Sequence, residues 1–102
     1  MTTLEVKKDK RLYRTGNIFL ECGAYRGDNY SAGWLFYCEA DYIAIYDTTA
    51  HKGIIVDRLQ LLPLLEQGKI ITYYDKIDDK NCKAVLLPMR KAANAIIYKW
   101  ED

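Results

Sequence analysis

The chain has 102 residues, half of them hydrophobic, and a formal net charge of only +1. This length suits a single domain over residues 1–102, with enough apolar content for a modest core without disulfides or a structural metal. The near-neutral charge excludes a global positive field that would attract nucleic acid. The longest apolar runs, such as 61–65, are far shorter than the roughly 20 residues that span a bilayer, and no secretory signal precedes them. We therefore expect a cytoplasmic protein with no membrane partner.

Alternating residues near the N-terminus predict a first strand. In residues 3–8, apolar side chains alternate with charged ones at the period of a half-buried strand. We expect the apolar pair, Leu4 and Val6, to point into the core. Glu5 and Lys7 would then share the opposite face.

A turn and a second strand are predicted next. Residues 15–17 (TGN) have turn chemistry, and the β-type run 18–22 (IFLEC) predicts a strand that pairs antiparallel with the first. Residues 23–33 contain three glycines among small polar residues, which is typical of a loop. Ser31 is placed to cap a short helix over 33–39.

The middle of the chain predicts two strands and a helix. Residues 41–46 and 53–56 are rich in aromatic and β-branched side chains, which favour strands. Asp57 is then placed to cap a helix over 58–67. Because proline lacks an N–H, Pro63 is expected to delay or kink that helix.

The C-terminal third gives one clear element and one open choice. Residues 69–80 mix polar and aromatic side chains without a clear period, whereas 83–87 predict a buried strand. Good helix formers favour a helix over 90–100. The alternative is a strand over 95–100, which contains two adjacent isoleucines.

Several reactive side chains have an ordinary structural explanation. The cysteines are odd in number and lack zinc-ligand spacing, so we expect small buried side chains. They are Cys22, Cys38 and Cys82. The only histidine, His51, is predicted in a surface turn, and the three aspartates of 75–79 are predicted in a solvated loop.

The Glu-x-Lys spacing of Glu5 and Lys7 suits phosphodiester chemistry. Hydrolysis by a magnesium enzyme needs carboxylates to hold the ion, an activated water, and a cation near the phosphoryl oxygens. On one strand face this spacing separates the carboxylate and the ammonium by about 6 to 7 Å. The carbonyl of Val6 between them is a further hard oxygen ligand.

Three segments carry a resemblance to a known family. They are residues 4–9 (LEVKKD), 15–21 (TGNIFLE) and 40–42 (ADY). Residues 2–47 thereby resemble a branch of the PD-(D/E)XK nuclease superfamily, often encoded by phages or plasmids. In that branch a Glu-Val-Lys strand precedes a Thr-Gly-Asn turn and an apolar strand that ends in Glu. The resemblance implies an α/β, restriction-endonuclease-like fold, a small mixed sheet flanked by helices, here truncated at its N-terminus.

The resemblance also implies the roles of individual residues. Glu5, Lys7 and Glu21 would form the catalytic set, with Mg²⁺ or Mn²⁺ bound by Glu5, Glu21 and the carbonyl of Val6. Lys7 would orient the attacking water. Asn17 would be the polar turn position, with a purely structural turn as its alternative.

One required feature of the family is missing. The family places an Asp on a strand upstream of Glu-x-Lys, and no such residue precedes Glu5 here. Magnesium sheds its waters reluctantly and is held poorly by a lone carboxylate. The substitute ligands, in order of preference, are Glu21, Asp9 and Asp28.

A basic segment follows the Glu-x-Lys strand. Five of the six charged residues in 7–14 are basic. This segment predicts contacts with DNA phosphates, although a solvated connection between strands is the plainer interpretation. The predicted nucleic-acid contacts are Lys8, Lys10, Arg11, Arg14 and Asn17.

Two functions fit these observations. The first is a metal-dependent DNA nuclease or Holliday-junction-resolvase-like phosphodiesterase. The alternative, favoured by the missing Asp, is a catalytically inactive nuclease-like fold that binds nucleic acid or a protein partner, for example as a phage inhibitor or accessory factor. An unpaired edge on the Glu-x-Lys strand also predicts a homodimer, which would bring acidic residues of a second chain to Glu5.

Overall fold

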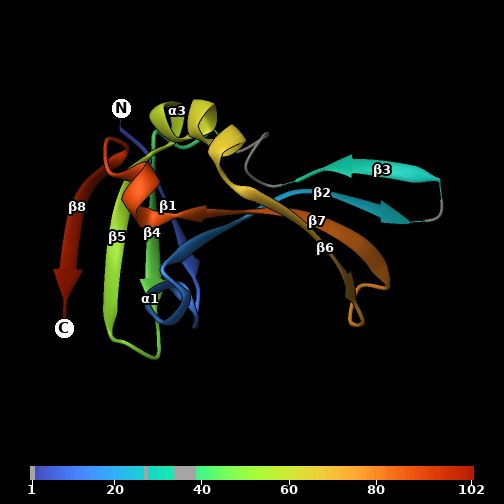
Figure 1. The fold of residues 1–102 in the computed structure, drawn as a ribbon, viewed down its shortest axis with the longest axis horizontal. Helices are drawn as coiled ribbons and strands as arrows, with labels where there is room; N and C mark the ends of the chain where they lie inside the picture. The colour runs from blue at the N-terminus through green and yellow to red at the C-terminus, as the bar shows by residue number, and fades with distance from the viewer. Residues whose placement is uncertain (1, 27, 34–38) are drawn as a thin grey trace.

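Two four-stranded sheets dominate the computed structural model, which describes residues 2–26, 28–33 and 39–102 (Figure 1). Sheet A has the order β1-β4-β5-β8, formed by β1 (Leu4–Lys8), β4 (Tyr42–Asp47), β5 (Lys52–Asp57) and β8 (Ile96–Glu101). Sheet B has the order β3-β2-β7-β6, formed by β2 (Asn17–Arg26), β3 (Asn29–Ala32), β6 (Lys69–Asp75) and β7 (Lys80–Pro88). Strand β1 runs parallel to β4, and the other neighbouring strands of the two sheets pair antiparallel. The protein is thus mixed α/β with a second sheet, where one sheet flanked by helices was predicted.

Short helices connect the strands. They are α1 (Leu12–Thr15), α3 (Arg58–Leu61) and the 3₁₀ helices η1 (Leu62–Gln67) and η2 (Met89–Ala92). The side chain of Asp57 accepts a hydrogen bond from the backbone N–H of Gln60, which confirms the predicted cap. Pro63 lies in the first turn of η1, where the helix has tightened to the 3₁₀ form. A proline has no N–H to donate, so it is tolerated at such a start but not in an α-helix interior.

The core lies between the inner face of sheet A and one end of sheet B. Its members are nearly inaccessible to solvent because apolar side chains from both sheets and from the short helices meet there. The largest are Leu12, Ile18, Leu20, Ile43, Ile45, Ile54, Val56, Leu61 and Leu87. The predicted strands over 41–46, 53–56 and 83–87 are confirmed, and each contributes to this core.

Strand β1 faces opposite to the prediction. The side chains of Leu4 and Val6 are 52% and 61% exposed. In the parallel register, Glu5 and Lys7 lie beside the buried Ile43 and Ile45, so they share the core-facing side of sheet A. The period of two showed correctly which residues share a face, but it contains no information about which face is covered.

Strand β2 also pairs differently from the prediction. It lies between β3 and β7 in sheet B, not beside β1. The intervening segment forms α1, whose buried Leu12 anchors it on the core and directs the chain into the other sheet. Gly16 ends α1 with φ +73°, a left-handed conformation that glycine adopts readily.

The predicted loop over 23–33 is mostly a hairpin. Residues 23–26 extend β2 and pair with β3, with Asp28 in the connecting turn. The predicted helix over 33–39 falls almost entirely outside the described residues, and Cys38 lies wholly outside them. His51 lies in an exposed turn with φ +57°, as predicted.

The C-terminal segment is a strand, so the predicted helix over 90–100 is wrong. Only η2 is helical there, and β8 pairs antiparallel with β5. The cross-strand partner of Trp100 is Gly53, and the indole covers the position where a Gly53 side chain would stand. The β-branched and aromatic residues of 96–100 gain more from this cross-strand packing than from helical propensity.

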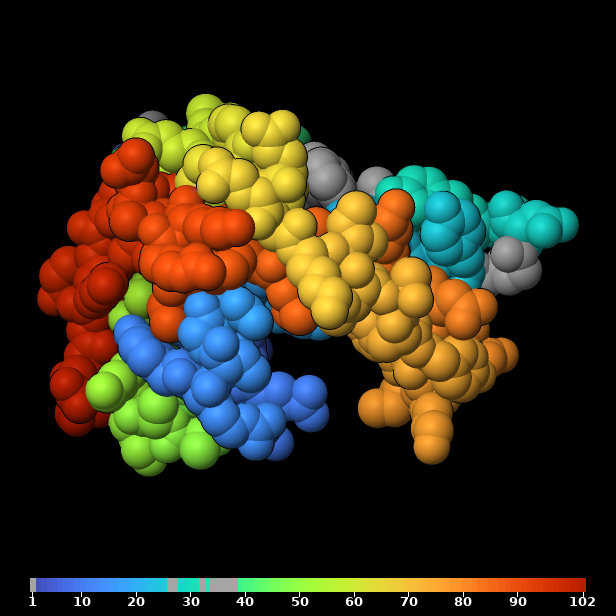
Figure 2. Space-filling view, viewed as in Figure 1, coloured from blue at the N-terminus to red at the C-terminus, as the bar shows by residue number. Residues whose placement is uncertain are grey.

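The molecule measures 40 × 30 × 25 Å along its principal axes. In the space-filling view, a notch separates the N-terminal residues (blue) from the β6–β7 hairpin (gold and orange) (Figure 2). Within the described residues, no helix combines the length and apolar character needed to cross a membrane.

Candidate functional site

Lys7, on sheet A, is close enough to Glu21, on sheet B, for the two charges to interact. Burial lowers the pKa of the Lys7 ammonium, and the negative charges of Glu21 and Asp9 partly oppose that shift. Lys7 comes from β1 in sheet A, whereas Glu21 comes from β2 in sheet B. Two predicted ligand candidates therefore lie within electrostatic range of the predicted lysine, and one of them comes from the other sheet.

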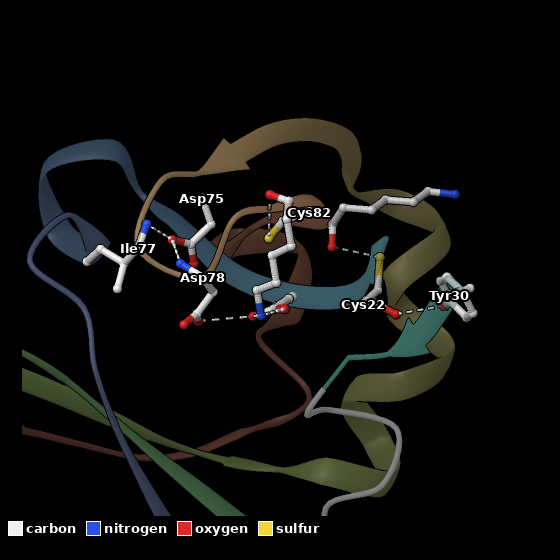
Figure 3. A network of polar contacts seen from close by, with 9 residues as sticks. Cys22, Tyr30, Asp75, Ile77, Asp78 and Cys82 are labelled. Carbon is white, nitrogen blue, oxygen red and sulfur yellow. Dashed lines mark hydrogen bonds and ion pairs between the residues drawn. The ribbon is translucent and has the colours of Figure 1, made fainter. Parts of the chain in front are cut away.

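Glu21 forms an ion pair with another lysine, Lys80. Its carboxylate lies 3.7 Å from the Nζ of Lys80, at the start of β7, and Lys80 lies 3.9 Å from Asp78. Figure 3 shows Asp78 on the turn before β7, beside Asp75 and Ile77. The carboxylate of Asp75 accepts hydrogen bonds from the backbone of Ile77 and Asp78, so it shapes this turn. Acidic and basic side chains thus alternate from Asp78 to Glu21.

A β-bulge positions Glu21. The register of β2 against β7 shifts between Glu21 and Gly23, leaving Cys22 as the extra residue. The Cys22 thiol donates to the carbonyl of Lys83 at 3.4 Å, and the Cys22 carbonyl accepts from the hydroxyl of Tyr30 at 3.1 Å (Figure 3). Bulges commonly redirect side chains beside functional sites.

The cysteine prediction is confirmed for Cys82, which is 2% exposed, while Cys22 is only half-buried. Neither forms a disulfide. Their thiols act as weak hydrogen-bond donors to backbone carbonyls in sheet B.

Glu5 lies on the same face of β1 as Lys7, and its side chain is exposed. Val6 sits between them in the β1–β4 ladder. Asp28 lies in the turn of the β2–β3 hairpin, at the far end of β2 from Asn17, so it is the least suitable substitute ligand.

The predicted metal ligands include two carboxylates, Glu5 and Glu21. Among the described residues, no group of three or more histidine, cysteine, aspartate or glutamate side chains is placed to hold a metal ion. Mg²⁺ commonly keeps several waters and takes only one or two carboxylates plus substrate phosphate, the number that this predicted pair would supply.

The predicted basic residues gather around α1. Three of them, Lys10, Arg11 and Arg14, form what we call the basic cluster. They line a pocket of about 550 Å³, the basic pocket, together with Asp47 and residues of the β4–β5 turn. None of the three forms an ion pair with another described residue. Lys8 is exposed at the end of β1. The segment therefore places three basic side chains around one pocket, whose lining also includes one carboxylate, that of Asp47.

The carboxylate in this pocket, Asp47, is 1% exposed. It accepts hydrogen bonds from the backbone N–H groups of Tyr13, Thr49 and Ala50 at 2.9 Å each. The bond from Tyr13 is the main reason that the pKa of Asp47 lies below its ordinary value, although burial acts in the opposite direction. One side chain therefore fastens α1 to the β4–β5 turn.

A smaller pocket of about 310 Å³ lies next to the basic pocket. Arg11 lines both. The smaller pocket is lined by Asp9, Arg11, Thr15, Asn17, Phe19, Ile71 and Leu86. The predicted contact Asn17 is therefore beside the basic cluster.

Sequence reasoning missed Lys80, Phe19 and Ile71. In the structure, residues 69–75 alternate in exposure, with Ile71 and Tyr73 less exposed than their neighbours, but the sequence of this segment shows no such alternation. It shows none because β6 lies at a sheet edge and both its faces carry apolar side chains.

No family model matches the chain, and no curated protein or solved structure gives a significant match. The functional argument therefore depends on the geometry of these residues.

Proposed function

We propose that this chain is a metal-dependent phosphodiesterase that acts on DNA, as its resemblance to PD-(D/E)XK nucleases implies. The observation that supports it best is the placement of Lys7, half-buried on β1 within electrostatic range of Glu21 from the other sheet. A lysine whose pKa is lowered by burial beside carboxylates is a candidate catalytic residue. The proposal assigns Glu5, Lys7 and Glu21 to the catalytic set.

In this proposal Glu5 and Glu21 hold Mg²⁺ or Mn²⁺ together with substrate phosphate. The bound ion would lower the pKa of a water and offset charge on the phosphoryl oxygens. Lys7 donates hydrogen bonds that orient the attacking water, and its lowered pKa allows it to release and recover a proton more readily than an exposed lysine. The attacking water would add to phosphorus and give up a proton to solvent, the phosphorus–oxygen bond to the leaving group would break, and the leaving oxygen would take a proton from solvent.

The basic cluster binds the DNA backbone in the same proposal. Lys10, Arg11 and Arg14 line one pocket and form no ion pair with a described acidic residue, so their three positive charges outnumber the single carboxylate there, that of Asp47. Phosphate contacts of this kind supply affinity without sequence preference and weaken with salt. The basic cluster would therefore position the DNA strand, and the proposed catalytic set would cleave it.

The alternative function is nucleic-acid or protein binding by an inactive nuclease-like fold. One observation favours it: Lys80 neutralises Glu21 from 3.7 Å, and a metal would have to compete with that ion pair. The protein would then bind its partner through the basic cluster without cleaving DNA.

The test is a cleavage assay with single-stranded and branched DNA in the presence of Mg²⁺ or Mn²⁺. We expect Glu5→Gln, Lys7→Ala and Glu21→Gln each to lower the rate at least about 100-fold, as removal of a transition-state contact commonly does. The matched control is Glu66→Gln, an exposed glutamate of η1, which should cleave like the wild type. A chelator should abolish cleavage.

Absence of cleavage and of divalent-ion binding by the folded wild type would remove the catalytic proposal. DNA affinity of the Lys10→Ala, Arg11→Ala and Arg14→Ala variants would then test the alternative. A combined fall of about tenfold or more, with a weaker salt dependence, would support nucleic-acid binding. Unchanged affinity would leave a protein partner as the better explanation.

A further inference from the structure

The pocket of about 310 Å³ beside the basic cluster has an apolar floor and a polar rim. The floor consists of Phe19, Ile71 and Leu86, three half-buried side chains from adjacent strands of sheet B. Phe19 is opposite Leu86 in the β2–β7 register, and its ring is steadied by Tyr73, with ring centroids 5.7 Å apart. The floor is thus a partly exposed apolar surface that includes an aromatic ring held by a second one.

Two of the four polar residues at the rim are engaged in local structure. The hydroxyl of Thr15 donates to the carbonyl of Arg11 at 2.8 Å and accepts from the backbone N–H of Asn17 at 3.2 Å. The carboxylate of Asp9 accepts from the backbone N–H of Arg11 at 2.8 Å. These bonds fix the α1 segment that forms the rim.

The other two rim side chains are available to a ligand. Within the described residues, neither the side-chain amide of Asn17 nor the guanidinium of Arg11 makes a hydrogen bond or an ion pair. Asn17 is half-buried at the pocket, so its amide has limited freedom to turn away. Both groups are planar and can form paired hydrogen bonds with the edge of a nucleobase.

We propose that this pocket binds one unpaired nucleobase of a DNA strand whose phosphates lie on the basic cluster. The inference rests on the proposed function and specifies its substrate class. A base combines an apolar face, which stacks on the aromatic ring of Phe19, with a polar edge, which suits Asn17 and Arg11. Because Arg11 also lines the basic pocket, the phosphate of the same nucleotide falls within reach of the positive charge.

A paired base inside a duplex cannot enter this pocket, since both its faces are covered by stacking and its edge is paired. The preferred substrates are therefore single strands, flaps or branch points that present an unstacked base. The pocket selects the structure of the DNA, and it places the strand next to Asp9, which itself lies within electrostatic range of Lys7.

The experiment uses a short single-stranded oligonucleotide that contains 2-aminopurine, whose fluorescence reports stacking, with EDTA present to prevent cleavage. The full chain is titrated against it and against a duplex of equal length. We expect the wild type to prefer the single strand and to change the 2-aminopurine fluorescence. Phe19→Leu should weaken single-strand binding about tenfold, as loss of a base–aromatic stack does, and leave duplex affinity unchanged.

Asn17→Ala is the second variant, because it removes a rim group without touching the core and remains informative if Phe19→Leu folds poorly. It should weaken single-strand binding severalfold. Tyr98→Leu is the matched control, since this aromatic is 57% exposed on sheet A and away from the pocket, and it should bind like the wild type. Thermal unfolding of each variant confirms that the fold is intact.

The inference is overturned if both pocket variants bind the single strand like the wild type, or if the duplex binds as tightly as the single strand. Its failure is separable from failure of the proposed function. A protein that cleaves DNA with Mg²⁺ but ignores Phe19→Leu and Asn17→Ala keeps the catalytic proposal and loses this one. Fluorescence changes that depend on Phe19, without any cleavage, support the nucleobase site and remove the catalytic proposal.

Discussion

The two sheets use the same kind of strand for different purposes. Sheet A buries its inner face along most of its length, through Ile43, Ile45, Ile54 and Val56. Sheet B contributes to the core at one end only, and its other end, formed by the β2–β3 and β6–β7 hairpins, extends away from sheet A (Figure 1). The difference predicts that stability resides mainly in sheet A and its contacts, while the far end of sheet B exposes large side chains such as Tyr25, Tyr30 and Tyr74.

This division is visible along β2 itself. Its first residues, Ile18 and Leu20, are completely buried, whereas Tyr25 near its end is 42% exposed. The radius of gyration is 13.7 Å, compared with about 13 Å for a typical domain of 100 residues, as an extended hairpin would produce. Glu21, in the candidate site, lies between the buried and the exposed parts of β2.

The same substitution in the two sheets should give the largest contrast. Ile54→Ala removes a fully buried side chain of sheet A and should lower the free energy of unfolding by about 2 to 5 kcal/mol. Ile70→Ala removes a side chain of β6 that is 59% exposed and should change it by less than about 0.5 kcal/mol. Urea denaturation measures both. Equal losses would contradict the division of stability between the sheets.

Removal of the buried carboxylate should have the next largest effect. Asp47→Ala leaves three backbone N–H groups without their acceptor and should lower the free energy of unfolding by about 2 to 3 kcal/mol at pH 7. Asp28→Asn, in an exposed turn, is the control and should have little effect.

The Asp47 carboxylate should also make stability depend on pH. Its pKa is lowered in the folded state, chiefly by the Tyr13 N–H, relative to the ordinary value of 3.8. The stabilisation is therefore fully present above pH 3.8 and is lost as the pH falls through the lower folded-state pKa. Urea titrations between pH 7 and pH 2 should show a component in the wild type that Asp47→Ala lacks. Parallel pH profiles would contradict this assignment.

A methyl group at Gly53 should have an intermediate effect. Its Cβ would collide with the indole of Trp100 on the neighbouring strand. Gly53→Ala should therefore lower the free energy of unfolding by about 1 to 3 kcal/mol, as overpacking does. Gly53→Ala combined with Trp100→Leu should recover part of the loss, measured by thermal unfolding. No recovery would show that the contact with the indole is not the cause.

The smallest expected change concerns Lys7. Because burial lowers its pKa, the unfolded chain binds this proton more tightly, and stability should rise with pH from the folded-state pKa up to 10.5. Lys7→Met removes the buried charge and should leave stability at pH 7 equal to or slightly above that of the wild type. A clear loss of stability would indicate that Lys7 is a structural residue. Thermal unfolding at pH 7 and pH 10 distinguishes these outcomes.

Local patterns in the sequence predicted local structure well. The strands that contain Ile43, Ile54 and Val85, and the Asp57 cap, follow from periodicity and capping within a few residues. The pairing of β2 and the orientation of Leu4 did not, because the partner of a strand and the face that is covered depend on distant segments. The same reason explains which site residues could be predicted. Glu21 was named from the resemblance, whereas the approach of Lys80 to Glu21 depends on the register of β7 against β2.

The extra residue at Cys22 acts as a phase shift in the alternation of β2. Before it, Phe19 and Glu21 share a face with Ala84 and Leu86; after it, the same face is continued by Ala24 instead of Gly23 and then Tyr25. A strand without this shift would place Tyr25 on that face opposite Lys80, the residue whose ammonium approaches Glu21. One inserted residue thus keeps the tyrosine ring off the face that carries Glu21 and Lys80.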